Sequence, residues 1–200
     1  MARSRKTVKT LKSSKVSERT QHYILKPTLH PNGWKLEVRA GNGTLLFTVL
    51  KHPTTPHQFK LLPANEQKVS PLRIRTTAVR DVLRYTLRED RQELLSILQA
   101  LNSPLVSVRN QQRETIARFS PLSPEIVLLR AISGSVAHLR FKEKPEPLGF
   151  QIECEAQPSD QWLYAIILYA VTRIESYEPL SRLEEKTQQD EDMTAESVKR

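Results

Sequence analysis

Residues 34–50 alternate apolar and charged side chains around a glycine-containing turn. Trp34, Leu36 and Val38 are separated by single charged residues, and this period of two places the apolar set on one face of a strand. The turn 41–43 (Gly-Asn-Gly) tolerates positive φ, and the apolar run 45–50 follows it. The pattern predicts an antiparallel β-hairpin with one face turned towards a core.

Further strands are predicted on both sides of this hairpin. A short apolar run at 23–25 leads to turn residues at 30–33, and segments 135–142 and 150–156 alternate as half-buried strands do. The run 126–132 is apolar and fits either a strand or a helix. The stretch 52–71 contains four prolines and is predicted to be a surface loop.

Helices are predicted in the middle and near the end of the chain. Apolar residues recur every three or four positions over 76–101, which is the stripe of an amphipathic helix, and a shorter helix is expected at 107–118. After a Ser159 or Asp160 N-cap, a third helix is predicted to extend to about Tyr177 and to carry the densest apolar face of the chain.

The order of these elements indicates an α+β fold. Antiparallel β-hairpins are expected to carry two or three helices packed on one face. The predicted organisation is a basic disordered arm at 1–20, a single α+β domain at 21–180 and an acidic, polar disordered tail at 181–200.

Composition narrows the class of protein. The chain has 200 residues, a formal charge of +9, 38% hydrophobic residues and one cysteine, which excludes collagen-like, coiled-coil and disulfide-stapled proteins. A lone cysteine and a start without an apolar leader favour an intracellular protein, in cytoplasm or nucleus, rather than a secreted one. No apolar run is long enough for a transmembrane segment.

Most of the positive charge lies in the N-terminal arm. Six basic residues and no acidic residue occupy positions 1–17; they are Arg3, Arg5, Lys6, Lys9, Lys12 and Lys15. Such a segment can neutralise phosphates of nucleic acid or lie on an anionic membrane. A solubilising tail or a short nuclear-import segment explains the same residues and stays open as an alternative.

A second basic feature lies in the predicted helix 76–101. Its arginines Arg80, Arg84, Arg88 and Arg91 repeat at helical spacing and could follow a phosphate backbone, since a guanidinium binds phosphate through two parallel hydrogen bonds. The alternative is an ordinary solvated helix face with pairs at i and i+4.

No enzyme signature is present. The sequence lacks a phosphate-binding loop, a GxSxG elbow and an HExxH pair, so neither catalytic residues nor a cofactor are predicted. His52 and His57 are interpreted as surface residues rather than metal ligands. Cys154 is interpreted as a buried apolar residue, and Trp34 and Trp162 as core anchors.

Two functional hypotheses remain. The first is a non-enzymatic structural or assembly protein, built like a small viral matrix or nucleic-acid-associated protein, whose basic arm binds RNA, a ribonucleoprotein or an acidic membrane surface. The second is an intracellular protein–protein adaptor in which the arm is secondary. A protein partner or self-association fits either hypothesis.

Overall fold

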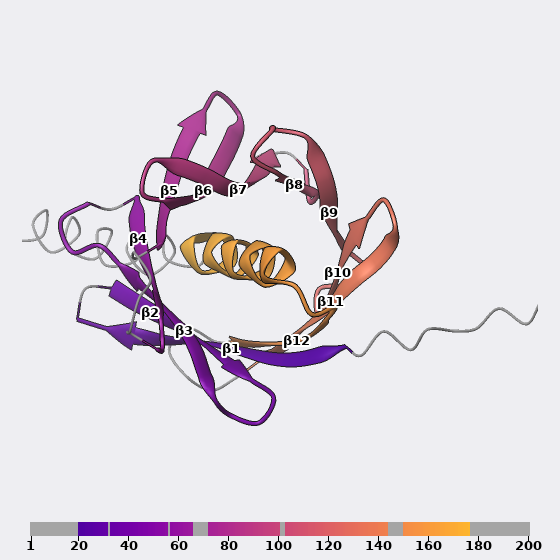
Figure 1. Ribbon diagram of the computed structural model, residues 1–200, viewed down its shortest axis with the longest axis horizontal. Coiled ribbons are helices and arrows are strands. Elements are labelled where there is room, and N and C mark those ends of the chain that lie inside the picture. Colours follow the sequence, from indigo (N-terminus) through magenta and orange to yellow (C-terminus); the bar gives the residue numbers. More distant parts are fainter. Residues whose placement is uncertain are drawn as a thin grey trace, which may run out of the picture.

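A computed structural model shows twelve antiparallel strands that close into a barrel around one helix (Figure 1). It describes residues 20–31, 33–55, 57–65, 72–100, 103–143 and 150–176. The strands are β1 (Gln21–His30), β2 (Gly33–Ala40), β3 (Leu45–Lys51), β4 (Gln58–Pro63), β5 (Leu72–Val79), β6 (Val82–Glu89), β7 (Gln92–Ala100), β8 (Val106–Arg109), β9 (Thr115–Pro121), β10 (Ile126–Ala131), β11 (Gly134–Glu143) and β12 (Phe150–Ala156).

The barrel is a simple meander in which every strand pairs with its neighbours in sequence. The ring is closed by β1 and β12, with Tyr23 opposite Cys154 and Leu25 opposite Ile152. Because successive strands run in opposite directions, the connections that follow odd-numbered strands lie at one end of the barrel, which we call rim A. The connections that follow even-numbered strands lie at the other end, which we call rim B.

Alternate residues of each strand point into the barrel. The inward set is apolar and includes Leu36 and Val38 of β2, Leu61 of β4 and Ile97 of β7, all of them fully buried. The intervening outward residues are largely polar. The period of two seen in the sequence therefore separates an apolar interior from a charged exterior.

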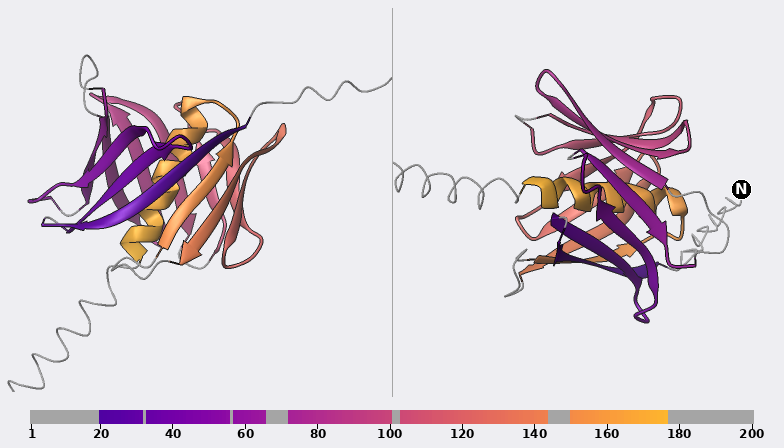
Figure 2. Two further views of the ribbon diagram at one scale, coloured as in Figure 1. Left: turned by 90° about the horizontal axis from the view of Figure 1, so that it is seen from below. Right: turned by 90° about the vertical axis from the view of Figure 1, so that its left-hand side faces the viewer.

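The interior is filled by the segment 160–176, which we call the central helix. It follows β12 at rim B and runs lengthwise inside the ring of strands (Figure 2). Residues 165–172 are buried without interruption, so the helix is covered on all sides. About eight strands suffice for side chains alone to fill a barrel, and twelve leave space that a helix can occupy.

Polar and aromatic contacts fix the central helix in place. At rim A, Trp34 Nε1 donates a 3.0 Å hydrogen bond to Glu175 Oε1, and Lys51 Nζ lies 3.6 Å from the same oxygen. Midway along the helix, Tyr169 stacks on Phe119 of β9 with ring centroids 4.2 Å apart. At rim B the first helical bond runs from Leu163 N to Ser159 O, the pattern of an N-cap.

The α+β prediction is wrong, because residues 76–100 of the predicted helix 76–101 belong to the hairpin series β5, β6 and β7. Its apolar residues had helical spacing because two short turns, Arg80-Asp81 and Asp90-Arg91, shift the phase of the alternation. Arg80 and Asp90 adopt φ of 53° and 50°. Glycine is usual at such positions, so the turns carried no sequence signal.

Two further elements are corrected. The predicted helix 107–118 is mostly β8 and β9, joined by a turn in which Arg113 has φ of 66°. The predicted loop 52–71 contains β4, where Phe59 and Leu61 point inwards between prolines. Only one helix occurs in the described residues, and it lies inside the barrel rather than on one face of a sheet.

Other predictions are confirmed. The hairpin 34–50 is β2 and β3, segments 135–142 and 150–156 are β11 and β12, and the helix after Ser159 is present. Trp34 is a buried core residue. The predicted tails lie outside the described residues, apart from Thr20, and the single-domain assignment stays a prediction.

Because the central helix fills the barrel, shortening one of its buried side chains should strongly reduce the free energy of unfolding. Ile167→Ala should lower the free energy of unfolding by roughly 2–5 kcal/mol, because it leaves a cavity where the surroundings are closely packed. Ile132→Ala is the matched control, since Ile132 is 96% exposed, and should change stability by less than about 0.5 kcal/mol. Urea unfolding measures both; equal stabilities would contradict the packing role.

The contact of Glu175 with Trp34 and Lys51 predicts that substitutions of Glu175 lower stability to different extents. Glu175→Ala should destabilise the protein by about 2–3 kcal/mol, because the indole N–H of Trp34 and the ammonium of Lys51 both lose a partner. Glu175→Gln retains an acceptor oxygen and should cost about 1 kcal/mol. Urea unfolding and the NMR shift of the Trp34 indole proton check the order; a larger loss for Gln than for Ala would refute it.

Candidate functional site

The excess of basic over acidic residues is largest on the strands from β4 to β10. These seven strands carry eight basic residues and two acidic ones, Glu89 and Glu93. The outer surface they form is called the cationic face. Its basic residues are Lys60, Arg73, Arg75, Arg84, Arg88, Arg109, Arg118 and Arg130.

Strand register aligns these residues in rows across the barrel wall. In one row Lys60, Arg73 and Arg88 are direct cross-strand neighbours on β4, β5 and β6, and the row ends at Glu93 of β7, the other neighbour of Arg88. In another, Arg118 of β9 lies opposite Arg130 of β10. Directly opposed like charges destabilise an antiparallel sheet, so these rows are an electrostatic cost to the folded barrel.

A third row shows how the side chains cover the wall. Thr86 and Ser96 are cross-strand neighbours on β6 and β7 and are buried although they point outwards. Arg84 Nη2 reaches Glu93 on β7 with bonds of 2.6 and 2.8 Å to its two carboxylate oxygens. The stems of such side chains shield the sheet from water while the charged ends reach the surface.

Several polar atoms on this face have no partner among the described residues. The Nε atoms of Arg84, Arg88 and Arg109 and the hydroxyl of Ser96 are buried and make no hydrogen bond there. Of the eight basic residues, only Arg84 forms an ion pair within the described part of the chain. The face therefore carries guanidinium groups whose charges the barrel leaves largely unbalanced.

The rest of the barrel wall is different. On β2, Glu37 pairs with Lys35 and Arg39 at 2.8 and 2.9 Å, and these hydrogen bonds hold the pKa of Glu37 below its usual value. On β12, Glu153 pairs with Lys142 at 2.6 Å, which likewise lowers the pKa of its carboxyl. Acidic and basic groups balance locally on these strands.

The predicted arginine series lies in part on this face. Arg84 and Arg88 are on the outer side of β6, whereas Arg80 and Arg91 lie in turns at opposite rims. They do not form one row, because the segment is not a helix. The basic residues at positions 3–15 lie outside the described residues.

Sequence reasoning missed most of the cationic face. Arg73 and Arg75 stand two apart among apolar residues, and this strand-like spacing was the available signal. Arg109, Arg118 and Arg130 join the face only through the register of β8, β9 and β10. Their proximity depends on the barrel and could not be read from local sequence.

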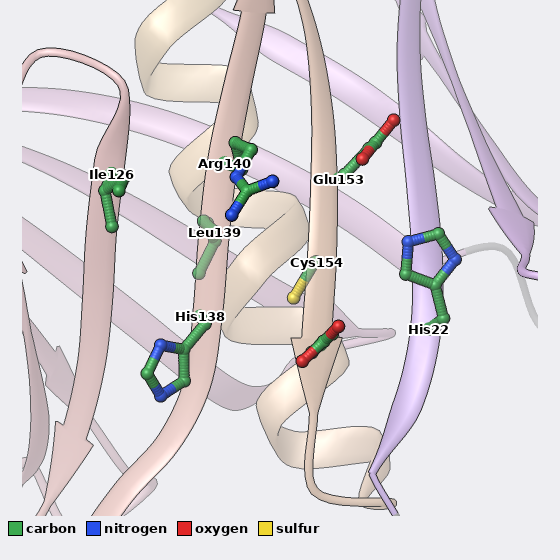
Figure 3. A pocket seen from close by; sticks show the side chains of 8 residues that line it. His22, Ile126, His138, Leu139, Arg140, Glu153 and Cys154 are labelled. Carbon is green, nitrogen blue, oxygen red and sulfur yellow. The ribbon is translucent and has the colours of Figure 1, made fainter.

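Two cavities lie away from the cationic face. A groove of about 260 Å³ on the outer side of β1, β11 and β12 is lined by His22, His138 and two glutamates (Figure 3). Both histidines are direct neighbours of Glu155, one on each side of β12. No group of three metal-ligating side chains capable of holding an ion occurs among the described residues.

The second cavity, of about 730 Å³, lies at rim B beside the start of the central helix. Its lining combines apolar side chains such as Phe47 and Leu163 with Asp160. Phe47 contacts Tyr164 edge to face at 6.0 Å. Burial is the main cause that raises the pKa of Tyr164, and it also raises the pKa of Tyr23 in the cavity wall, so both phenols remain neutral.

The only cysteine is not a nucleophile. Cys154 is buried on the inner face of β12, and burial raises its pKa to about 12. A thiol needs its anionic form to react, so Cys154 is inert at neutral pH. This burial confirms the sequence interpretation of Cys154 as an apolar core residue.

Comparison with known proteins gives no relative: neither a protein family, nor a curated protein, nor a solved structure matches the chain. Within the described residues, no helix has both the length and the apolar character needed to cross a membrane.

Burial of Cys154 and Tyr85 predicts loss of stability in alkali. Burial raises the pKa of each to about 12, above the ordinary values near 9 and 10. The unfolded chain therefore releases these protons first, and stability falls as pH rises from 9 to 12. The loss from Cys154 alone is at most about 4 kcal/mol.

Urea unfolding between pH 8 and pH 11 measures this effect. Cys154→Ala should flatten the decline above pH 9, and Tyr85→Phe should flatten it above pH 10, whatever their stability at pH 8. An unchanged slope in both variants would show that these groups are not buried as described.

Proposed function

We propose that the protein is a non-enzymatic docking protein that binds a phosphate-bearing anionic partner through its cationic face. The observation that carries this proposal is the alignment of like charges in register, with Lys60, Arg73 and Arg88 in one row and Arg118 opposite Arg130 in another. The barrel gains no stability from these pairs. An anionic ligand would relieve their repulsion.

The chemistry of the face suits phosphate oxygens. Seven of its eight basic residues are arginines, whose guanidinium groups bind phosphate through paired, charge-assisted hydrogen bonds. The basic N-terminal segment 1–17 adds six positive charges and would increase the attraction at a distance. Such binding weakens as salt screens the charges.

No feature of the described residues calls for catalysis. The cavity at rim B contains one acidic side chain, Asp160, and the two glutamates of the outer groove lie beside basic residues. The proposal therefore assigns binding rather than turnover. It keeps an anionic partner from the sequence hypothesis and moves the main contact from the arm to the barrel wall.

Two triple variants with the same net charge test the proposal. Arg73→Gln, Arg118→Gln and Arg130→Gln remove three exposed charges from the cationic face. Lys26→Gln, Arg39→Gln and Arg140→Gln remove three from the remaining wall. With about 1 kcal/mol per basic residue near an acidic surface, the first set should weaken binding roughly a hundredfold and the second much less.

Binding is measured by sedimentation with phosphatidylserine-containing vesicles and, separately, with duplex RNA, each at several salt concentrations. The cationic-face variant should also be at least as stable as the parent, because like-charge pairs are removed. Equal losses of affinity in both triple variants would mean that binding depends on net charge alone and not on the cationic face. Absence of binding to either partner would overturn the proposal.

A further inference from the structure

We propose that the barrel docks on an acidic lipid bilayer with three apolar side chains of rim A inserted between the lipid headgroups. The residues are Val79, Leu105 and Leu122, called here the apolar tips. The inference rests on the proposed function, since the cationic face supplies the attraction. It adds the class of partner, the orientation of the barrel and a contact that salt does not screen.

The distribution of exposed apolar residues is uneven. Of the five large hydrophobic residues exposed in the described structure, Leu29, Val79, Leu105 and Leu122 lie at rim A, with exposures of 59, 64, 45 and 59%. The fifth, Ile132, lies in the β10–β11 turn at rim B. Scattered exposed residues are normal, but concentration at one end suggests an interaction surface.

The apolar tips lie at the ends of the same strands that form the cationic face. Val79 ends β5, Leu105 precedes β8 and Leu122 follows β9, so they occupy three consecutive connections of rim A. Leu29 lies near the rim A end of β1, about a third to a half of the ring away from the tips. Arg84 lies towards the rim A end of its strand, whereas Arg73, Arg88 and Arg130 lie towards rim B. The barrel must therefore lie on its side for the basic wall and its apolar border to meet one surface together.

The form of this border favours a bilayer over a protein partner. Neighbouring tips are two strands apart, roughly 10 Å at the usual strand spacing, so they project singly rather than as one continuous patch. A lipid interface accepts separate apolar side chains a few ångströms deep and attracts the basic groups behind them. A protein interface needs a contiguous packed core.

Charged residues at the same rim limit the depth of insertion. Arg80 and Asp81 form the turn after Val79, and Glu125 lies in the turn that begins at Leu122. These groups must stay among the headgroups, because a charge in the hydrocarbon region is costly. The tips supply apolar contact only, and the net attraction comes from the arginines of the wall.

Tryptophan placed at the tips reports insertion directly. Val79→Trp and Leu122→Trp should each be quenched by phosphatidylserine vesicles with brominated acyl chains, whereas Ile132→Trp at rim B should not. The native Trp34 and Trp162 give the same background in all three proteins. Equal quenching at rim A and rim B, or no quenching at rim A while the protein is vesicle-bound, would overturn the proposal.

A second experiment separates this inference from the proposed function. Replacing Val79, Leu105 and Leu122 together by Ser should weaken vesicle binding about tenfold or more and leave duplex RNA binding unchanged; Ile132→Ser is the control. If the serine variant binds vesicles like the parent while the cationic-face variant does not, binding through the cationic face is supported and insertion of the apolar tips is refuted. If neither set of substitutions weakens binding, both proposals fall.

Discussion

Burial of the central helix inside the ring of strands is the contact on which the rest of the structure depends. A twelve-stranded barrel is too wide for its own side chains to fill, and its inward faces would lose most of their packing without the helix. The consecutive residues Ile166, Ile167 and Leu168 are all fully buried, and at 100° per residue they face the barrel on different sides of the helix axis. Trp34 and Lys51 hold the far end through Glu175.

This arrangement explains why the sequence predicted some parts of the fold and not others. The hairpin 34–50 has both its alternation and its glycine turn within one local segment, so a period-based analysis finds it. The hairpins of β5, β6 and β7 turn at Arg80-Asp81 and Asp90-Arg91 instead. Because no glycine marks these turns, the spacing of apolar residues over the three strands resembled that of one amphipathic helix.

The position of the helix was also beyond local reasoning. Its apolar density was visible at 162–174, and a helix that is apolar on all sides belongs in an interior. What the sequence did not reveal is the number of strands, since β4, β8 and β9 are short or flanked by proline and charged residues. The barrel and the helix each require the other. Because the strands β5 to β9 were predicted as helices, the fold class was predicted as α+β instead of a barrel.

The same alternation that builds the core leaves the outer positions available for another task. Any outward residue tolerated by water would preserve the barrel, yet the wall from β4 to β10 places Arg73 beside Arg88 and Arg118 beside Arg130. Neighbouring like charges oppose folding, while β2 and β12 show that this barrel also accommodates paired charges. Glu93 neutralises part of this wall through Arg84, and the like-charge pairs that remain despite their cost are the reason for proposing a ligand outside the chain.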